Sequence, residues 1–192
     1  MKRLLLTLVL LLPLAVRADP QQAIEEFQSA LLEFARGDVA SFDERFALLQ
    51  PVVESTHDLD YISRLTLGRY WVGLDAGQRE AFLARFQQLA VANYAARFPR
   101  FAGERFEIVE QEAQPRGIVL VRTRLHRPDE TVLDFDYLLR ETDSGWRIVN
   151  ILVNGVSDLA LKRAEYSVLL RDGNMADLLQ TLDDQYARLS SD

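Results

Sequence analysis

The stretch TVLDFDYLLRETDSGWRIVNILV, residues 131–153, decides the fold. Apolar and acidic residues alternate in its first half. The apolar face carries Leu133, Phe135, Tyr137 and Leu139, and the opposite face carries Asp134 and Asp136. This period of two predicts a β-strand over Thr131–Arg140 with one face toward a core. Because only the short turn Asp143–Gly145 follows, we expect Trp146–Val153 to pair with it as an antiparallel strand.

The fourth predicted strand, Trp146–Val153, differs from the third because it is apolar on both faces. One face has Trp146, Ile148 and Leu152, and the other has Val149, Ile151 and Val153. A strand of this kind is covered on both sides or bends around something.

Two further strands precede this pair, over Phe106–Glu112 and Ile118–His126, and short turns containing proline or glycine separate them. Turns this short predict an antiparallel meander of four strands. Arg122 and Arg124 share one face of the second strand, so we expect them to pair with Asp134 and Asp136 across the sheet.

Helical periodicity surrounds the strand block. Before the strands, two helices are predicted around Ile24–Phe34, ended by Gly37, and around Phe42–Leu49, closed by Pro51. A third is predicted over Leu59–Leu65 after an Asp58 cap. The longest is predicted over Ala76–Phe98 after an Asp75–Gln78 capping box. After the strands, Ser157 and Asn174 are expected to cap two more helices. The pattern predicts an α+β domain with a curved antiparallel four-stranded sheet packed with helices around an apolar pocket, an NTF2-like cone with additional helices.

The N-terminal eighteen residues have the pattern of a signal peptide. Lys2 and Arg3 precede an apolar run over Leu4–Val16, and Val16 and Ala18 are small residues at the −3 and −1 positions of a cut. We therefore expect residues 1–18 to be removed, with a retained anchor as the alternative, and residues 19–192 to form a single domain. No cysteine follows the run, and none occurs in the chain, so disulfides and thiolate sites are excluded.

Net charge excludes one class of partner. Removal of residues 1–18 takes away Lys2, Arg3 and Arg17, three of the 22 basic residues. The remaining chain then has 19 basic and 29 acidic residues and a net charge of −10. Such a chain should not bind nucleic acid or anionic headgroups through bulk charge.

Catalytic and metal-binding patterns are scarce. The two histidines, His57 and His126, lack partners at metal-ligand spacing, so both are interpreted as ordinary surface residues. Asp134 and Asp136 could act as an acid–base pair, but an outward polar face explains them more simply. In contrast, the long helix and the third and fourth strands each offer more apolar width than one packing partner uses, which predicts the pocket.

Three segments, residues 62–71 (ISRLTLGRYW) with the following helix, residues 145–157 (GWRIVNILVNGVS), and the tail from Tyr166 through Gly173 and the last helix, together resemble the phospholipid-binding MlaC (toluene-tolerance) family. The family often has an acidic residue where Asn150 stands. Residues 155–163 (GVSDLALKR) also resemble the hopanoid-biosynthesis branch of that family.

This resemblance implies a periplasmic, non-enzymatic carrier that shuttles phospholipid or hopanoid between the inner and outer membranes. The implied partners are a membrane-tethered substrate-binding component of an inner-membrane ABC transporter and an outer-membrane lipid complex, and no cofactor is expected. We expect a monomer. Two alternatives stay open: an isomerase- or dehydratase-like enzyme of the cone fold, and an exported interaction module without ligand.

Face assignment gives a predicted pocket wall. Its members are Leu65, Tyr70, Trp71, Phe82, Phe86, Leu89, Phe135, Tyr137, Trp146, Val149, Ile151 and Val153. Arg69 and Arg97 are predicted at the mouth. Since each CH₂ exposed to water costs about 0.8 kcal/mol, a sixteen-carbon chain must be enclosed almost completely, and a shallow groove would not suffice.

Overall fold

The computed structural model describes residues 19–37, 41–97 and 103–191, so the predicted signal peptide lies outside the described part of the chain. One antiparallel sheet has the strand order β1-β2-β3-β4-β5. Its strands are β1 (Arg105–Gln114), β2 (Ile118–His126), β3 (Val132–Thr142), β4 (Gly145–Val153) and β5 (Val156–Ser157). A short 3₁₀ turn, η2 (Pro115–Gly117), joins β1 to β2. The α+β class is therefore confirmed, and the NTF2-like comparison stays a prediction.

The prediction of four strands is wrong by one, because the chain turns back after β4. Asn154 and Gly155 have φ angles of 50° and 77°, the left-handed conformation that a two-residue hairpin of this type requires. The Asn154 backbone N–H donates to the Asp134 carbonyl at 2.9 Å, and its side-chain oxygen accepts from the Asp134 N–H at 3.0 Å. These two bonds fasten the turn to β3 and add β5.

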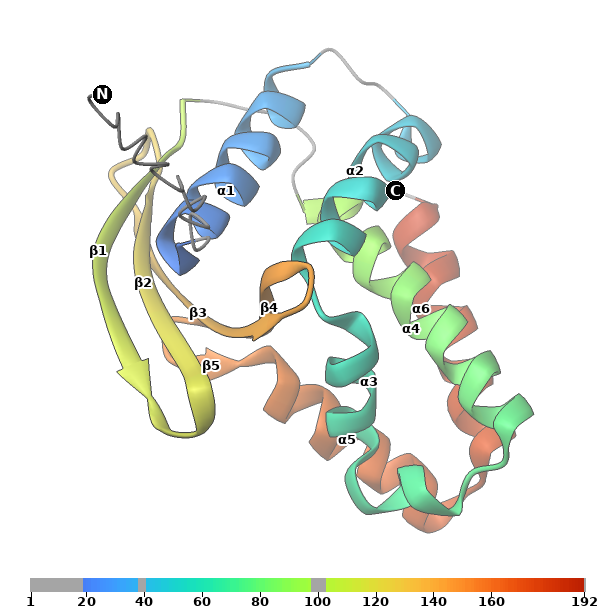
Figure 1. The fold of residues 1–192 in the computed structure, drawn as a ribbon. Coiled ribbons are helices and arrows are strands. Elements are labelled where there is room, and N and C mark those ends of the chain that lie inside the picture. The colour runs from blue at the N-terminus through green and yellow to red at the C-terminus, as the bar shows by residue number, and fades with distance from the viewer. Residues whose placement is uncertain (1–18, 38–40, 98–102, 192) are drawn as a thin grey trace, which may run out of the picture.

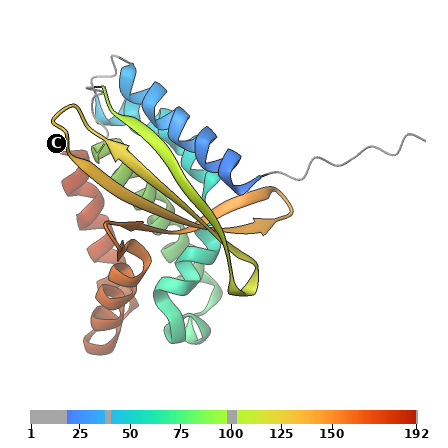
Figure 2. The ribbon, with the colours of Figure 1, turned by 90° about the vertical axis from the view of Figure 1, so that its left-hand side faces the viewer.

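All described helices lie on one face of the sheet, and Figure 2 shows the strands in front of them. They are α1 (Pro20–Arg36), α2 (Phe42–Thr56), α3 (Leu59–Leu67), the 3₁₀ helix η1 (Gly68–Gly73), α4 (Ala76–Arg97), α5 (Asp158–Asp172) and α6 (Met175–Ser190). Helix α1 packs against the sheet, whereas α4 and α6 pack side by side on the far side of the molecule (Figure 1). None of the helices among the described residues is long and apolar enough to cross a membrane.

The predicted caps form where expected. Asp75 and Gln78 make reciprocal bonds at the start of α4, and the Asp58, Ser157 and Asn174 side chains cap α3, α5 and α6. The predicted end of the second helix at Pro51 is wrong, since α2 continues to Thr56. Proline removes one hydrogen bond from the helix, but the turn beyond it places Val53 at 0% exposure in the core, and this burial favours continuation.

A β-bulge explains why β4 is apolar on both faces. Leu139 lies opposite Ile148 and Leu138 lies opposite Asn150, so Val149 is an extra residue in β4. A bulge inverts the alternation of faces along its strand. Ile148 before the bulge and Ile151 after it therefore share the inner face of the sheet.

The opposite face of the sheet is polar and ion-paired. Arg124 lies across from Asp134, with Nε and Oδ1 3.3 Å apart, and Arg122 lies across from Asp136. Arg122 also pairs with Glu110 of β1. The predicted cross-strand placement is confirmed, and both aspartates are accounted for without an acid–base role.

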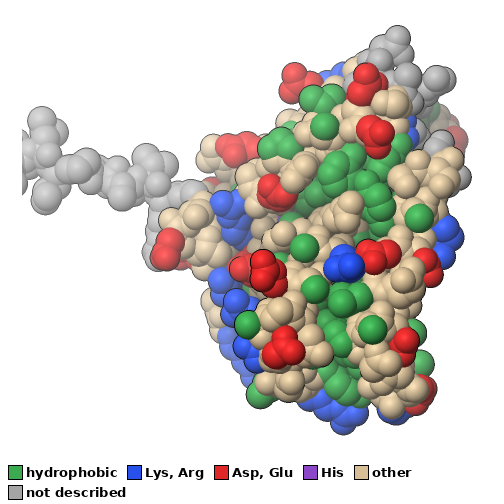
Figure 3. All heavy atoms as spheres, turned by 90° about the vertical axis from the view of Figure 1, so that its right-hand side faces the viewer, with side chains coloured by type: hydrophobic (Ala, Val, Ile, Leu, Met, Phe, Trp, Pro, Cys, Tyr) green, Lys and Arg blue, Asp and Glu red, His purple; other side chains and the backbone are tan. Residues whose placement is uncertain are grey.

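The helical side exposes part of its apolar residues. Figure 3 shows hydrophobic side chains in an upper and a lower group along the middle of this side, with charged side chains between the two groups and around them. Individual exposed members of the helical layer include Leu48 at 55% and Val168 at 48%.

Two neighbouring leucines of α2 provide a matched test of this core. Leu49 is fully buried and Leu48 is 55% exposed. We expect Leu49→Ala to lower the free energy of unfolding by about 2–5 kcal/mol, because it removes buried methyl groups and leaves a void. Leu48→Ala should change it by less than about 0.5 kcal/mol. Urea unfolding followed by circular dichroism measures both, and equal losses would contradict the packing described here.

Candidate functional site

A cavity of about 490 Å³ lies between the inner face of the sheet and the helices. This volume is within the range of about 300–1,000 Å³ that is typical of small-molecule sites. Its wall comes from α1, α3, α4, the inner faces of β3 and β4, and the start of α5. The cavity therefore occupies the part of the sheet that α1 leaves uncovered.

Six of the twelve predicted wall residues line this cavity. They are Phe86, Phe135, Tyr137, Val149, Ile151 and Val153. Ile151 and Val153 follow from the bulge at Val149, after which they lie opposite the inward-facing Tyr137 and Phe135. Contact of these six with a ligand stays a prediction.

The other six predicted wall residues lie elsewhere. Phe82 is fully buried and packs against Tyr166 of α5, with ring centroids 5.9 Å apart. Trp71 lies between Arg64 and Arg79, whose guanidinium carbons are 5.6 and 5.5 Å from the ring centroid. The remaining four are Leu65 on α3, Tyr70 on η1, Trp146 on β4 and Leu89 on α4, and Leu89 lines a second, smaller cavity.

Of the two arginines predicted at the mouth, the structure places one at the cavity. Arg97 contributes to its lining together with Arg127 and Glu104. Arg69 instead lies over the Tyr70 ring, 5.0 Å from its centroid. The cavity lining thus contains side chains of both charges.

Residues that sequence reasoning did not assign to the wall come mainly from α1, α3 and α5. They include Leu31, Leu32 and Ala35; Leu59 and Ile62; and Val156, Leu159 and Leu161. Helical periodicity marks Leu31 and Ile62 as inward-facing, but it does not show which neighbour each helix meets. The Asn154-Gly155 pair was the available signal that the chain turns back to place α5 at the cavity.

The interpretation of His57 as a surface residue is wrong. His57 is 7% exposed and lines the cavity. Its position is set by the chain on both sides: its own N–H donates to the Val53 carbonyl, and the N–H of Asp58 donates to Ile148 of β4 at 2.9 Å. The junction between α2 and α3 is thereby hydrogen-bonded to the sheet.

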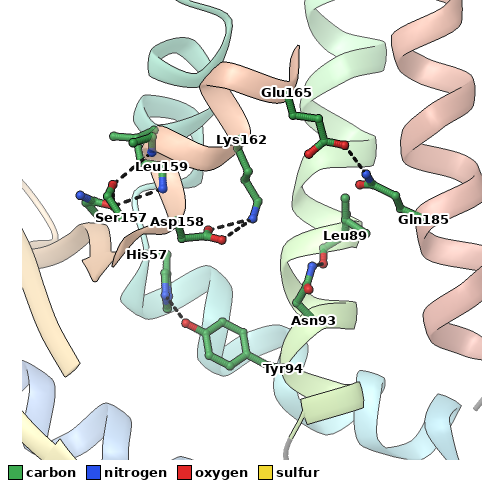
Figure 4. A network of polar contacts seen from close by, with 12 residues as sticks. His57, Leu89, Asn93, Tyr94, Ser157, Asp158, Leu159, Lys162, Glu165 and Gln185 are labelled. Atoms are coloured by element: carbon green, nitrogen blue, oxygen red, sulfur yellow. Dashed lines mark hydrogen bonds and ion pairs between the residues drawn. The ribbon is translucent and has the colours of Figure 1, made fainter. Parts of the chain in front are cut away.

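His57 and Tyr94 point toward each other across the cavity wall (Figure 4). His57 Nδ1 lies 3.2 Å from the Val53 carbonyl oxygen, which can only accept, so Nδ1 carries the hydrogen. Nε2 lies 2.9 Å from the Tyr94 hydroxyl oxygen and, in the neutral ring, accepts from that hydroxyl.

Burial keeps His57 neutral. Desolvation lowers the pKa of His57 from 6.5 to about 4, outweighing the opposite effects of the Val53 carbonyl and of Asp158. The pKa of the Tyr94 hydroxyl is raised well above 10, again mainly by burial. The pair is a neutral hydrogen-bonded contact within the working pH range of most proteins.

A second polar group stands at the start of α5. Lys162 Nζ contacts both Asp158 oxygens, at 2.7 and 2.8 Å, one helical turn apart (Figure 4). Asn150 Oδ1 accepts from the Ser157 hydroxyl and from the Leu159 N–H. Asn150 therefore helps to position the N-terminus of α5 against β4, a polar role for this position in the chain.

The residues considered for acid–base chemistry do not line the cavity. Asp134 and Asp136 lie on the opposite face of the sheet, and His126 contacts Glu107 with Nε2 2.6 Å from Oε2. Partial burial raises the pKa of Asp136, but this carboxyl is away from the cavity. No cluster of three or more potential metal-binding side chains occurs among the residues that the structure describes.

Comparison with known proteins identifies a family and solved structures of similar fold. The family model described as "MlaC protein" matches residues 21–184. Among solved structures, the fold is similar to that of a phospholipid-binding protein from Ralstonia solanacearum in complex with a phospholipid, with a TM-score of 0.80 and 20% sequence identity. The match covers 90% of this chain and 99% of that one.

The buried histidine should make stability depend on pH. The unfolded chain protonates His57 near pH 6.5 and the folded chain only near pH 4, so the unfolded state binds more protons between these values. Stability therefore falls as the pH drops through this window. From pH 7 to pH 5 we expect a loss of about 2 kcal/mol from this group.

Urea unfolding of the wild type, His57→Gln and His126→Gln at pH 7 and pH 5 measures this loss. The His57 variant should show a flattened dependence, and the His126 variant should retain it. A wild-type stability that is unchanged down to pH 5 would show that His57 is not buried as described.

Proposed function

Since the chain belongs to the MlaC family, we propose that it is a lipid carrier whose cargo occupies the cavity beneath β3 and β4. The observation that supports this most directly is the cavity itself. It is apolar along Phe135, Ile151 and Leu31, and it lies in the fold shared with a protein solved in complex with a phospholipid.

The physical basis of the proposal is the cost of hydrating hydrocarbon. Each CH₂ exposed to water costs about 0.8 kcal/mol, so an acyl tail crosses an aqueous compartment only when it is enclosed. Moving the tail from a bilayer into an apolar cavity exchanges one apolar medium for another. The net free energy of loading can then be small, which allows release as well as uptake.

The finer part of the proposal concerns place and partners. We propose that the signal peptide directs the chain to the periplasm and that the carrier shuttles lipid between the inner and outer membranes. Its partners would be the membrane-tethered substrate-binding component of an ABC transporter and an outer-membrane lipid complex. Because the net free energy of loading is small, the direction of lipid transport would be set by these partners rather than by the carrier.

The cargo is proposed to be a phospholipid, with a hopanoid as the second candidate. The phospholipid is supported by the ligand in the solved structure of similar fold. The hopanoid is supported by the resemblance of residues 155–163, whose Val156, Leu159 and Leu161 line the cavity. Denaturing mass spectrometry of protein purified from a Gram-negative host distinguishes the two. Protein that contains neither would contradict the carrier proposal.

Filling the cavity should prevent loading. Ala90 of α4 lines the cavity, and Ala84 of the same helix is exposed. We expect Ala90→Phe to reduce bound lipid at least about tenfold, because its ring occupies the space of a tail, and to retain the fold because a void is available. Bound lipid per protein is quantified by mass spectrometry after incubation with liposomes.

Ala84→Phe is the matched control and should load like the wild type. Melting temperatures of both variants verify folding. Normal loading of a folded Ala90→Phe protein would place the lipid outside this cavity. Mass spectrometry of the same samples also tests the enzyme alternative, since a carrier returns its lipid with an unchanged mass.

A further inference from the structure

A second, smaller cavity of about 240 Å³ adjoins the first one between α4, α5 and α6. The two cavities share Asn93 and Lys162 in their linings. Beyond these two residues its wall contains Glu165, Tyr166, Gln185 and Arg188, together with Leu89 and Leu189. We call the second cavity the polar annex.

The Tyr166 hydroxyl is an unusual feature of the annex. Tyr166 is 1% exposed, and its hydroxyl is buried without a hydrogen-bond partner in the described part of the chain. A buried donor left without a partner is destabilising, and such groups in native proteins have a reason to persist. A ligand group that accepts this hydrogen bond would provide one.

Two cations, Lys162 and Arg188, and one carboxylate, Glu165, line the annex. Lys162 contacts Asp158 of the main cavity, so this pair carries no net charge. Glu165 accepts from Gln185 with Nε2 and Oε1 2.6 Å apart (Figure 4). With the Lys162–Asp158 pair neutral, Arg188 and Glu165 contribute one charge of each sign, and the charges at the annex are balanced.

This balance decides between headgroup classes. A net anionic headgroup would bring one uncompensated charge into the annex, whereas a zwitterionic headgroup adds none. Charge-assisted hydrogen bonds to phosphate are the strong ones, and a carboxylate is the matching partner for an ammonium group. The annex therefore offers a partner for each charge of a phosphate–amine headgroup.

We propose that the polar annex binds the headgroup of a zwitterionic phospholipid whose tails occupy the main cavity. The Tyr166 hydroxyl and Arg188 bind the phosphate, and Glu165 binds the ammonium group. Asn93 and Lys162 stand at the junction between tails and headgroup. This inference rests on the proposed carrier function and adds selectivity for the cargo.

The test is a competition between two lipids with the same tails. Delipidated full-length mature protein is incubated with liposomes of equal dioleoyl phosphatidylethanolamine and dioleoyl phosphatidylglycerol, and bound lipid is quantified by mass spectrometry. We expect the wild type to bind the ethanolamine lipid in at least about fivefold excess. Tyr166→Phe and Arg188→Gln should each bring the ratio close to one, while uptake of palmitic acid stays unchanged.

Two controls separate headgroup binding from a structural role. Tyr166→Phe removes a hydroxyl with no described protein partner, so its melting temperature should equal or exceed that of the wild type. Tyr70→Phe, on η1 and away from the annex, should keep the wild-type ratio.

The possible outcomes are distinguishable. Equal binding of the two lipids by the wild type, or an unchanged ratio in both annex variants, overturns the proposal that the annex binds the headgroup. The carrier proposal is not affected by either result. A lower melting temperature of Tyr166→Phe with an unchanged ratio shows that a structural water uses the hydroxyl, which also overturns the annex proposal. Failure of the wild type to bind any lipid overturns both proposals.

Discussion

The packing of α1 against the inner face of β2 and β3 is the contact on which the remaining structure depends. Gln28 of α1 is 3% exposed, and its amide lies 3.0 Å from Thr123 Oγ1 and 3.4 Å from the Tyr137 hydroxyl oxygen. The ring of Phe27 makes edge contacts with Tyr137, His57 and Tyr94. A buried amide with specific partners permits one position of the helix on the sheet, because any slip leaves polar groups unpaired. This fixed position sets one wall of the cavity, which lies between α1, the inner faces of β3 and β4, and the helices α3, α4 and α5.

What the sequence predicts well is local. Alternation in β3, the caps of α3 to α6 and the arginine–aspartate register all depend on neighbours along or directly across the chain. Two wrong predictions concern residues whose environment is set by distant parts of the chain. The continuation of α2 past Pro51 depends on the burial of Val53 by other elements, and the burial of His57 depends on its bond network with β4 and α4. Neither contact has a signature in the residues around it, since both are decided by tertiary packing.

The bulge at Val149 shows how a correct observation can have a different cause. Apolar residues on both faces of Trp146–Val153 indicated covering on both sides, yet the extra residue reverses the alternation, so that Ile148 before the bulge and Ile151 after it both face inward. Six residues of the predicted wall line the main cavity, five of them inward-facing residues of β3 and β4. Helix residues are harder to assign, because an apolar helix face can meet either a cavity or another helix. Phe86 lines the cavity, whereas Phe82, one turn earlier on α4, packs against Tyr166.

The site has a polarity gradient that follows from these contacts. On the sheet side the cavity wall is mostly hydrocarbon and aromatic, and the buried His57 in this wall is kept neutral by desolvation. On the α5 side the wall has Asp158 and Lys162, which are joined to each other and are shielded less. A molecule with an apolar and a charged end fits such a gradient in one orientation only, since the reverse would remove its charges from water without partners. The Asn150 contacts with Ser157 and Leu159 fix the start of α5 on β4, so the same backbone junction that closes the apolar cavity also positions its polar end.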